Sequence, residues 1–208
     1  MEYKITVVGI GPGSPDFLLP IAARTIHQAG LLIGSQRALD TLAPKTAVTK
    51  RITKDIDQLI DFMDCQLKKM DIVVMVSGDP GFYSLLTALK SHFSPEQLRV
   101  IPGISSVQAA FSKIGEVWQD ANLISMHGRT VDAKQLSYTP GKKLGILTDE
   151  KHNPNYISQQ LLENGWPANS RVWLCAELSY DTERIIQLTL ATALTISNFE
   201  HCVMVVTE

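Results

Sequence analysis

The chain has few cysteines and no long hydrophobic run, and each of these absences excludes a class of protein. Its three cysteines, Cys65, Cys175 and Cys202, are widely separated and form no CxxC pair. That spacing argues against a disulfide framework and against a zinc knuckle, so we expect no metal site and three buried apolar thiols. No apolar run approaches the ~20 residues that a membrane span needs.

The chain also has no large excess of acidic or of basic residues. The formal net charge of −2 over 208 residues shows no basic excess of the kind found in nucleic-acid-binding proteins. The opening segment MEYKITVVGIGPGS has neither the cationic region nor the cleavage site of a signal peptide. We therefore expect a cytoplasmic protein that binds neither nucleic acid nor a membrane.

Strand-like and helix-like segments alternate through the first half of the chain, which predicts an α/β fold with a parallel sheet. Strands are expected at 3–10 and 31–34 and again from 71 and from 98; helices are expected at 20–29 and 54–69. From 121 onward strands mostly follow one another, with one helix at 153–165, so the second sheet should be mixed. We predict two α/β domains, 1–115 and 116–208, with the active-site cleft between them.

Three of the predicted strands end in loops of one kind. These are VGIGPGSP at 8–15, VSGDPGFYS at 76–84 and VIPGISS at 100–106. In an open α/β sheet, ligands bind beyond the carboxyl ends of the strands. Glycine lets a backbone approach a ligand closely and proline stiffens the loop, so we expect the three loops to form one cleft.

The first loop departs from the known phosphate-binding patterns. A G-x-G-x-x-G fingerprint would need glycine where Ser14 stands, and Pro12 removes an N–H that a pyrophosphate would use. No G-x-x-x-x-G-K-[ST] segment occurs in the chain. The loop is better suited to a neutral or cationic adenosine ligand, and S-adenosylmethionine has that character. A nicotinamide oxidoreductase is correspondingly disfavoured.

In their order and their intervals, the three loops resemble the motifs of the tetrapyrrole methylases, the class III S-adenosylmethionine-dependent methyltransferases. The matching segments are Gly9–Gly13, Gly78–Pro80 followed by Tyr83 and Ser84, and Pro102–Ser106. Within that family, SMHGR at 125–129 and AELSY at 176–180 resemble the branch that methylates C5 of precorrins in cobalamin biosynthesis. The resemblance implies that S-adenosylmethionine is the donor, S-adenosylhomocysteine the product and cobalt-precorrin-7, or its cobalt-free equivalent, the acceptor.

The resemblance also implies partners. Some relatives carry a fused domain that methylates C15 and decarboxylates the ring. Because this chain stops at Glu208, we expect that activity on another polypeptide, with transient contact between the two. A homodimer is expected on the same ground.

The resemblance also implies roles for individual residues of this sequence. The cofactor contacts implied by the family are Gly11, Pro12, Gly78, Asp79, Phe82, Ser105, Ser106, Thr148, Leu178 and His201. The substrate contacts are Tyr83, His127 and Arg129, with Lys134 as a further cation, because the acceptor carries acetate and propionate groups. Asp79, His127 and Arg129 are the candidate catalytic residues, in the sense that they position the ligands, and no general base is named.

Each of these residues also has a structural interpretation. Asp79 suits a turn and Ser105 and Ser106 suit helix caps. His127 is equally compatible with a satisfied structural histidine, and His201 with the core of an apolar strand. His27, His92 and His152 have no companion pattern and are interpreted as surface residues. The alternative functions are methylation of another precorrin carbon, methylation of a non-tetrapyrrole acceptor such as a modified protein histidine, and a non-catalytic binding module for the cofactor.

Overall fold

The chain forms two compact α/β units, Met1–Ser105 and Ser106–Glu208. The computed structural model describes residues 3–199 and 201–208. Helix α5 (Ser106–Ile114) belongs to the second unit, because it packs against two strands of the second sheet. The sequence-based boundary, between 115 and 116, places this helix with the first unit instead.

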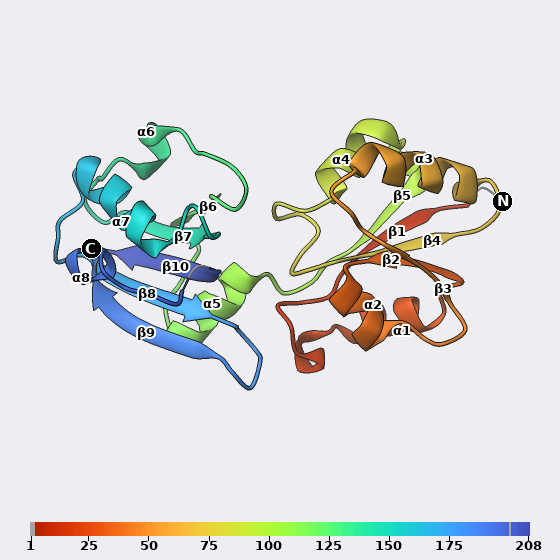
Figure 1. Ribbon diagram of the computed structural model, residues 1–208, viewed down its shortest axis with the longest axis horizontal. Helices are drawn as coiled ribbons and strands as arrows, with labels where there is room; N and C mark the ends of the chain where they lie inside the picture. Colours follow the sequence, from red (N-terminus) through yellow and green to blue (C-terminus); the bar gives the residue numbers. More distant parts are fainter. Residues whose placement is uncertain (1–2, 200) are drawn as a thin grey trace. The chain divides into compact units, whose positions relative to one another are not determined.

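The first unit is a five-stranded parallel sheet with helices on both faces (Figure 1). The strand order is β3-β2-β4-β1-β5, so β1 lies between β4 and β5. The strands are β1 (Ile5–Gly9), β2 (Leu31–Gly34), β3 (Val48–Arg51), β4 (Ile72–Val76) and β5 (Leu98–Ile101). The helices are η1 (Pro15–Phe17), α1 (Pro20–His27), α2 (Gln36–Leu42), α3 (Ile56–Leu67), α4 (Leu86–His92) and η2 (Pro95–Gln97).

Two hydrophobic cores fill the two faces of this sheet. Leu59, Met63 and Leu89 of α3 and α4 pack on one face, while Ala22 and Leu39 of α1 and α2 pack on the other. Strand β4 is buried along its whole length, as its uninterrupted run IVVMV predicts. The sheet is thus fixed from both sides, and its loops extend from a rigid edge.

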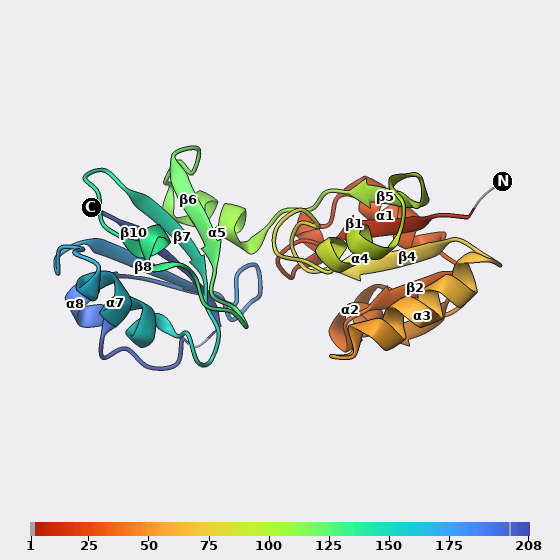
Figure 2. The same ribbon diagram turned by 90° about the horizontal axis from the view of Figure 1, so that it is seen from above.

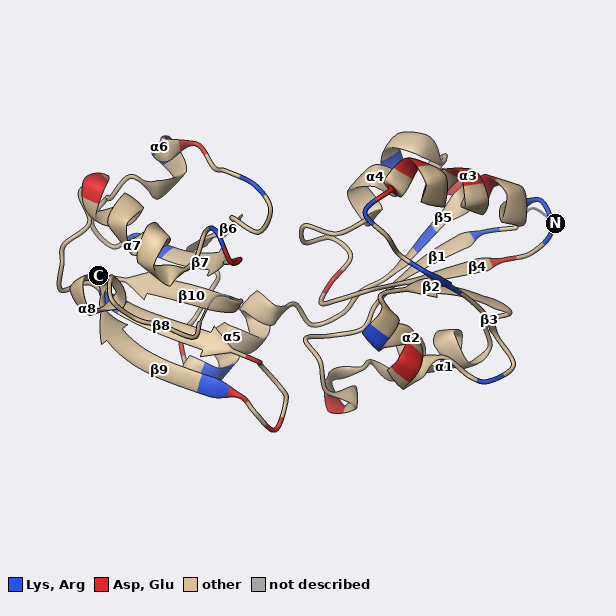
Figure 3. Cartoon of the chain, viewed as in Figure 1, with Lys and Arg blue, Asp and Glu red and all other residues tan. Residues whose placement is uncertain are grey.

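The positions of the buried side chains on α3 explain why the prediction of a buried Cys65 is wrong. Asp55 caps the helix by accepting a hydrogen bond from the Gln58 backbone N–H. The buried side chains recur at helical spacing, and acidic residues mark the helix in Figure 3. Cys65 lies outside the buried stripe and is exposed, whereas Cys175 and Cys202 are buried as expected.

The second unit is built on a five-stranded mixed sheet with the order β6-β7-β10-β8-β9 (Figure 2). Only β6 and β7 run parallel among its described strands; the other pairs are antiparallel. The strands are β6 (Ala121–Ser125), β7 (Lys143–Leu147), β8 (Arg171–Ala176), β9 (Arg184–Thr189) and β10 (Cys202–Thr207). Besides α5, the helices are α6 (Ala133–Leu136), α7 (Pro154–Glu163) and α8 (Leu190–Ala193).

The two units confirm the predicted α/β fold class, including the parallel first sheet and the mixed second sheet. Segments 36–42 and 48–51, which form α2 and β3, went unassigned in the sequence. Strand β3 is mostly exposed at the sheet edge, so its residues VTKR show no buried-strand pattern. None of the helices among the described residues has the length and apolar character of a transmembrane span.

Candidate functional site

The three glycine-proline loops lie side by side in the first unit. They follow β4, β1 and β5, which are neighbours in the parallel sheet, so their carboxyl ends share one edge. Gly11 and Gly78 form an antiparallel bridge between the first two loops: the Gly11 N–H donates to the Gly78 carbonyl over 3.3 Å and the Gly78 N–H donates back over 2.8 Å. The predicted convergence of these loops is therefore confirmed.

Glycine is required where the loops touch. A Cβ placed on Gly103 would lie 2.2 Å from the Gly78 carbonyl oxygen, and one on Gly9 would lie 2.6 Å from the Gly103 nitrogen. Both distances are shorter than real Cβ contacts allow, and the opposing atoms belong to backbone. The glycines at these positions let three chain segments cross at backbone contact distance.

Asp79 links the second loop to the third. One of its carboxylate oxygens accepts the Gly103 N–H at 2.9 Å, and the other accepts the Gly81 N–H at 2.7 Å within its own turn. Asp79 is therefore both a turn former and a cross-link between loops. Its negative charge lies where the loops meet, and the N–H groups of Gly11 and Gly103 are already engaged within the protein.

Aromatic side chains follow this junction. Phe82 is half-buried and its ring packs edge-on against Tyr83, with the centroids 4.8 Å apart. Tyr83 has a positive φ of 49° and its side chain is exposed. A non-glycine residue in that conformation is strained, and such residues cluster at functional sites. Pro12 is half-buried and Ser105 is buried, and both belong to the same group of loops.

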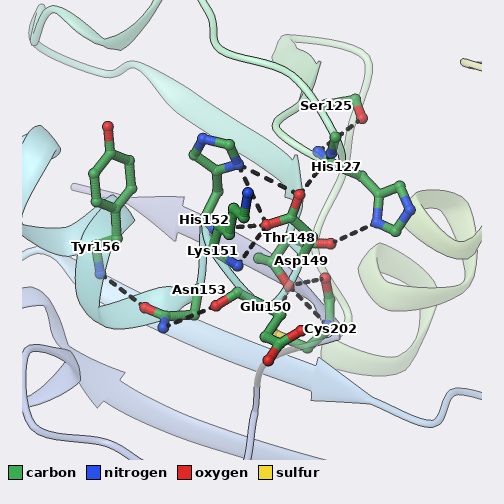
Figure 4. Close-up of polar contacts among 11 residues, drawn as sticks. Ser125, His127, Thr148, Asp149, Glu150, Lys151, His152, Asn153, Tyr156 and Cys202 are labelled. Carbon is green, nitrogen blue, oxygen red and sulfur yellow. Dashed lines mark hydrogen bonds and ion pairs between the residues drawn. The ribbon is translucent and has the colours of Figure 1, made fainter.

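In the second unit, the loops after β6 and β7 form a second polar cluster (Figure 4). The His127 Nδ1 donates to the Thr148 carbonyl at 3.1 Å, and the His127 backbone N–H donates to the Ser125 hydroxyl at 3.3 Å. His127 is exposed, as is Arg129 two residues later. Figure 3 shows positive charge on the loop between β6 and α6, and Lys134 on α6 is also exposed.

Thr148 is buried and connects β7 to the start of β10. Its hydroxyl donates to the Cys202 carbonyl at 2.9 Å and accepts the Cys202 N–H at 2.8 Å. His201, which the sequence placed inside an apolar strand, is exposed and lies just before β10 begins at Cys202. A core role for His201 is therefore wrong; its ring centroid is 6.2 Å from that of His127.

Leu178 lies on a strained loop after β8. It is buried and stands between Glu177 and Ser179, which have positive φ values of 51° and 71°. The Glu183 carboxylate accepts the Ser179 N–H at 2.7 Å and forms an ion pair with Lys113 of α5 at 2.7 Å. Burial acts to raise the pKa of Glu183, but the hydrogen bonds from Lys113 and from Ser179 outweigh it and lower that pKa.

Asp149 and His152 are the residues that the sequence did not indicate. Asp149 accepts hydrogen bonds from the backbone N–H groups of Gly128, Lys151 and His152 at 2.6, 2.9 and 2.6 Å. Burial acts to raise the pKa of Asp149, but these backbone bonds and the His152 ring hold it well below its usual range. His152 is half-buried against this carboxylate, so its interpretation as a surface residue is wrong. Lys151 and His152 are local partners of Asp149, two and three residues along the chain, whereas only the fold brings Gly128 to it.

Ser106 is the first residue of α5, and that helix covers the sheet of the second unit through Val107 and Phe111. The side chains of both reach Gly145 of β7, where a Cβ would lie 2.9–3.0 Å from them. Among the residues that the structure describes, no group of three metal-ligating side chains is close enough to hold an ion.

The chain matches the family model of the Tetrapyrrole (Corrin/Porphyrin) Methylases over residues 4–194. It belongs to the tetrapyrrole methylase family. It is 35% identical to the cobalt-precorrin-7 C(5)-methyltransferase of Salmonella typhimurium, over 87% of this chain and 88% of that protein. It is also 28% identical to the precorrin-6Y C(5,15)-methyltransferase [decarboxylating] of a Sinorhizobium species, over 87% of this chain and 44% of that protein.

The fold of this tetrapyrrole methylase is also found in a solved structure of another protein. The crystal structure of the uroporphyrin-III C-methyltransferase of Thermus thermophilus in complex with S-adenosylhomocysteine superposes with a TM-score of 0.77 at 20% identity. The match covers 99% of this chain and 92% of that one. The resemblance inferred from the three loops is thus confirmed at the level of the family and of the fold.

Proposed function

We propose that the chain transfers a methyl group from S-adenosylmethionine to C5 of cobalt-precorrin-7 in cobalamin biosynthesis. The observation that carries the proposal is the 35% identity to a cobalt-precorrin-7 C(5)-methyltransferase over nearly the whole of both chains. The loop geometry of the first unit supports it independently, because three loops meet where an open parallel sheet binds its ligand.

The charge of the loop junction fits a cationic donor better than a phosphate. The Asp79 carboxylate lies at the junction, and the Gly11 and Gly103 N–H groups already have acceptors within the protein. An anionic phosphate would meet a negative charge there and would lack the N–H donors that such sites use. S-adenosylmethionine supplies a methyl group that is already activated on a positively charged sulfur.

The residues of the first unit then have stated roles. Gly11, Pro12 and Gly78 shape the cofactor surface through their backbones, Asp79 holds the loops, and Phe82 and Ser105 contact the cofactor from the flanking loops. The half-buried Phe82 offers an apolar surface and the Ser105 hydroxyl a polar one. In the second unit, Ser106, Thr148, Leu178 and His201 are the proposed cofactor contacts.

For the acceptor, we propose contacts from Tyr83, His127 and Arg129. An exposed aromatic ring such as that of Tyr83 can pack on a macrocycle, and exposed basic side chains can pair with its carboxylates. The His127 Nδ1 donates to a carbonyl, so the ring is fixed with its Nε2 as the remaining polar atom. The transfer forms a carbon–carbon bond from an electron pair of the macrocycle and breaks the carbon–sulfur bond, whose electron pair stays on sulfur. The positive charge of the donor passes to the macrocycle, which releases one proton to water. Positioning at ~3–3.5 Å and exclusion of water are then the main requirements on the protein.

The test is incubation of the purified chain with cobalt-precorrin-7 and S-adenosylmethionine labelled with ¹³C in the methyl group. The expected product carries one labelled methyl at C5 by NMR, and S-adenosylhomocysteine appears in equal amount. Label at another ring carbon, or none in the macrocycle, would overturn the choice of acceptor. Cofactor binding by calorimetry without turnover on any precorrin would favour the non-catalytic binding module.

We also propose a cytoplasmic homodimer that makes transient contact with the C15-methylating decarboxylase. The support for the contact is that this chain spans 44% of a relative whose name combines both methylations. Light scattering should give twice the mass of one chain, and cross-linking with the decarboxylase should yield a mixed adduct. A monomer in solution would contradict the first part, and the absence of a mixed adduct the second.

A further inference from the structure

Loop 126–129 of the second unit, which carries the proposed acceptor contacts, is held by a side chain from a neighbouring loop. Asp149 follows β7, and loop 126–129 follows β6, the parallel neighbour of β7. The Asp149 Oδ2 accepts the Gly128 N–H at 2.6 Å, across 21 positions of sequence. The side chain of Asp149 is 13% exposed, whereas Gly128 is exposed, so the carboxylate reaches outward from a largely buried position to hold a surface loop.

The same carboxylate also accepts hydrogen bonds from residues of its own loop. Its Oδ1 accepts the Lys151 and His152 N–H groups, and the His152 Nδ1 lies 3.3 Å from its Oδ2. A carboxylate with three backbone donors and a ring nitrogen is fixed in place and stays ionised, since every one of these donors favours the charged form. Asp149 is thus held in one position, and a carboxylate that stays ionised does not serve as a general acid.

Gly128 has a backbone conformation that favours glycine and lies at the surface. Its φ of 68° is in the left-handed region, yet a Cβ built on it would meet nothing within 4 Å. The side of Gly128 on which a Cβ would lie is therefore open space. At its start, loop 126–129 is fixed by the buried Met126, whose N–H donates to the Leu147 carbonyl at 2.9 Å, and by the His127 N–H on the Ser125 hydroxyl. Further along, the contacts besides Asp149 include the His127 ring on the Thr148 carbonyl and the weak 3.4 Å bond from the Arg129 N–H to the Met126 carbonyl.

We propose that Asp149 is a positioning residue for acceptor recognition: by holding the Gly128 N–H it fixes the directions of the His127 and Arg129 side chains on either side. This inference rests on the proposed function. Two basic side chains on a fixed backbone are already placed to pair with two carboxylates at a matching separation. A mobile loop must first be ordered, and the entropy lost in ordering it reduces the binding free energy. Loss of the Asp149 carboxylate should therefore weaken binding of a polycarboxylate acceptor and leave the cofactor unaffected.

The experiment compares the wild type with Asp149→Asn and with Asp55→Asn as the matched control. Asp55 also accepts a backbone N–H, but it does so at the cap of α3 in the first unit. His152→Asn is the second variant, because it removes the ring while leaving the carboxylate and its backbone donors. Initial rates are measured with cobalt-precorrin-7 and S-adenosylmethionine varied in turn, and hydrogen–deuterium exchange is followed in the peptide that contains 126–131.

We expect Asp149→Asn to raise the KM for cobalt-precorrin-7 about tenfold, with the KM for S-adenosylmethionine within twofold of wild type and kcat reduced less than threefold. Exchange in 126–131 should be at least tenfold faster. His152→Asn should shift the same KM in the same direction by a smaller factor, and Asp55→Asn should leave both KM values and this peptide unchanged.

Three results would overturn the inference: unchanged exchange in 126–131, a KM for the cofactor that rises as much as that for the acceptor, or a lower kcat with both KM values unchanged. The last is the signature of a purely structural role. If the wild-type chain does not methylate cobalt-precorrin-7, the proposed function is wrong and the acceptor half of the inference falls with it. The exchange measurement still decides in that case whether Asp149 holds the loop.

Discussion

Gly103→Ala is the sharpest test of the loop junction. The added Cβ would lie 2.2 Å from the Gly78 carbonyl oxygen, about 1.2 Å short of the 3.4 Å at which ordinary contact begins. It would also lie 2.8 Å from the carbonyl carbon of Gly9, so the methyl group is opposed from two loops. All of these atoms belong to backbone, and none can move aside by a change of rotamer.

Overpacking of this kind costs about 1–3 kcal/mol, and the upper end is expected here because whole loops must shift. A loss of about 3 kcal/mol corresponds to a melting temperature lower by about 6–12 °C for a chain of this length. The control is Gly30→Ala, whose Cβ would approach only the end of the Met70 side chain, at 3.6 Å. Because glycine to alanine there meets ordinary contact, we expect a change within about 1 kcal/mol.

Two measurements check the prediction. Urea unfolding gives the stability of each variant, and calorimetry gives the affinity for S-adenosylhomocysteine, which should fall at least tenfold for Gly103→Ala alone. If Gly103→Ala and Gly30→Ala unfold at the same urea concentration, the reasoning about the close approach is refuted. If only the affinity is unchanged, the loops meet as described but do not bind the cofactor.

Three further predictions follow from single contacts. Asp79→Ala should lower stability by about 2 kcal/mol, since two hydrogen bonds to a carboxylate are lost; unchanged urea unfolding would contradict this. Thr148→Val should cost about 2 kcal/mol by calorimetric melting because a buried hydroxyl with two hydrogen bonds is removed, whereas Thr148→Ser should restore most of it. Glu183→Gln should cost about 0.5–1 kcal/mol at pH 7, since the partner Lys113 is 40% exposed. The pKa of Glu183 is lowered on folding, so this contribution is complete at neutral pH and is lost as the pH falls through the lowered pKa; a difference between wild type and variant that persists in acid would refute the assignment.

The sequence alone predicted most of the elements and the loop motifs. Buried strands such as β4 are continuous apolar runs, and α3 shows a helical stripe with a capping aspartate, so both are visible in a short window. Failures arose where burial depends on distant neighbours. Strand β3 is an exposed edge, Cys65 lies outside the buried stripe of its helix, and His201 lies one residue before its strand begins.

What the sequence determined by itself is therefore local: the strands and helices, the three glycine-proline loops and, through their order, the family. The tertiary structure decided which of these segments meet. The position of β1 between β4 and β5 places the three loops at one edge, and only then can Asp79 bond to Gly103. Asp149 reaches Gly128 for the same reason, because β6 and β7 are parallel neighbours. Hydrophobic periodicity reports which side of an element is buried, whereas strand order follows from the packing of the whole sheet, which no short window of residues contains.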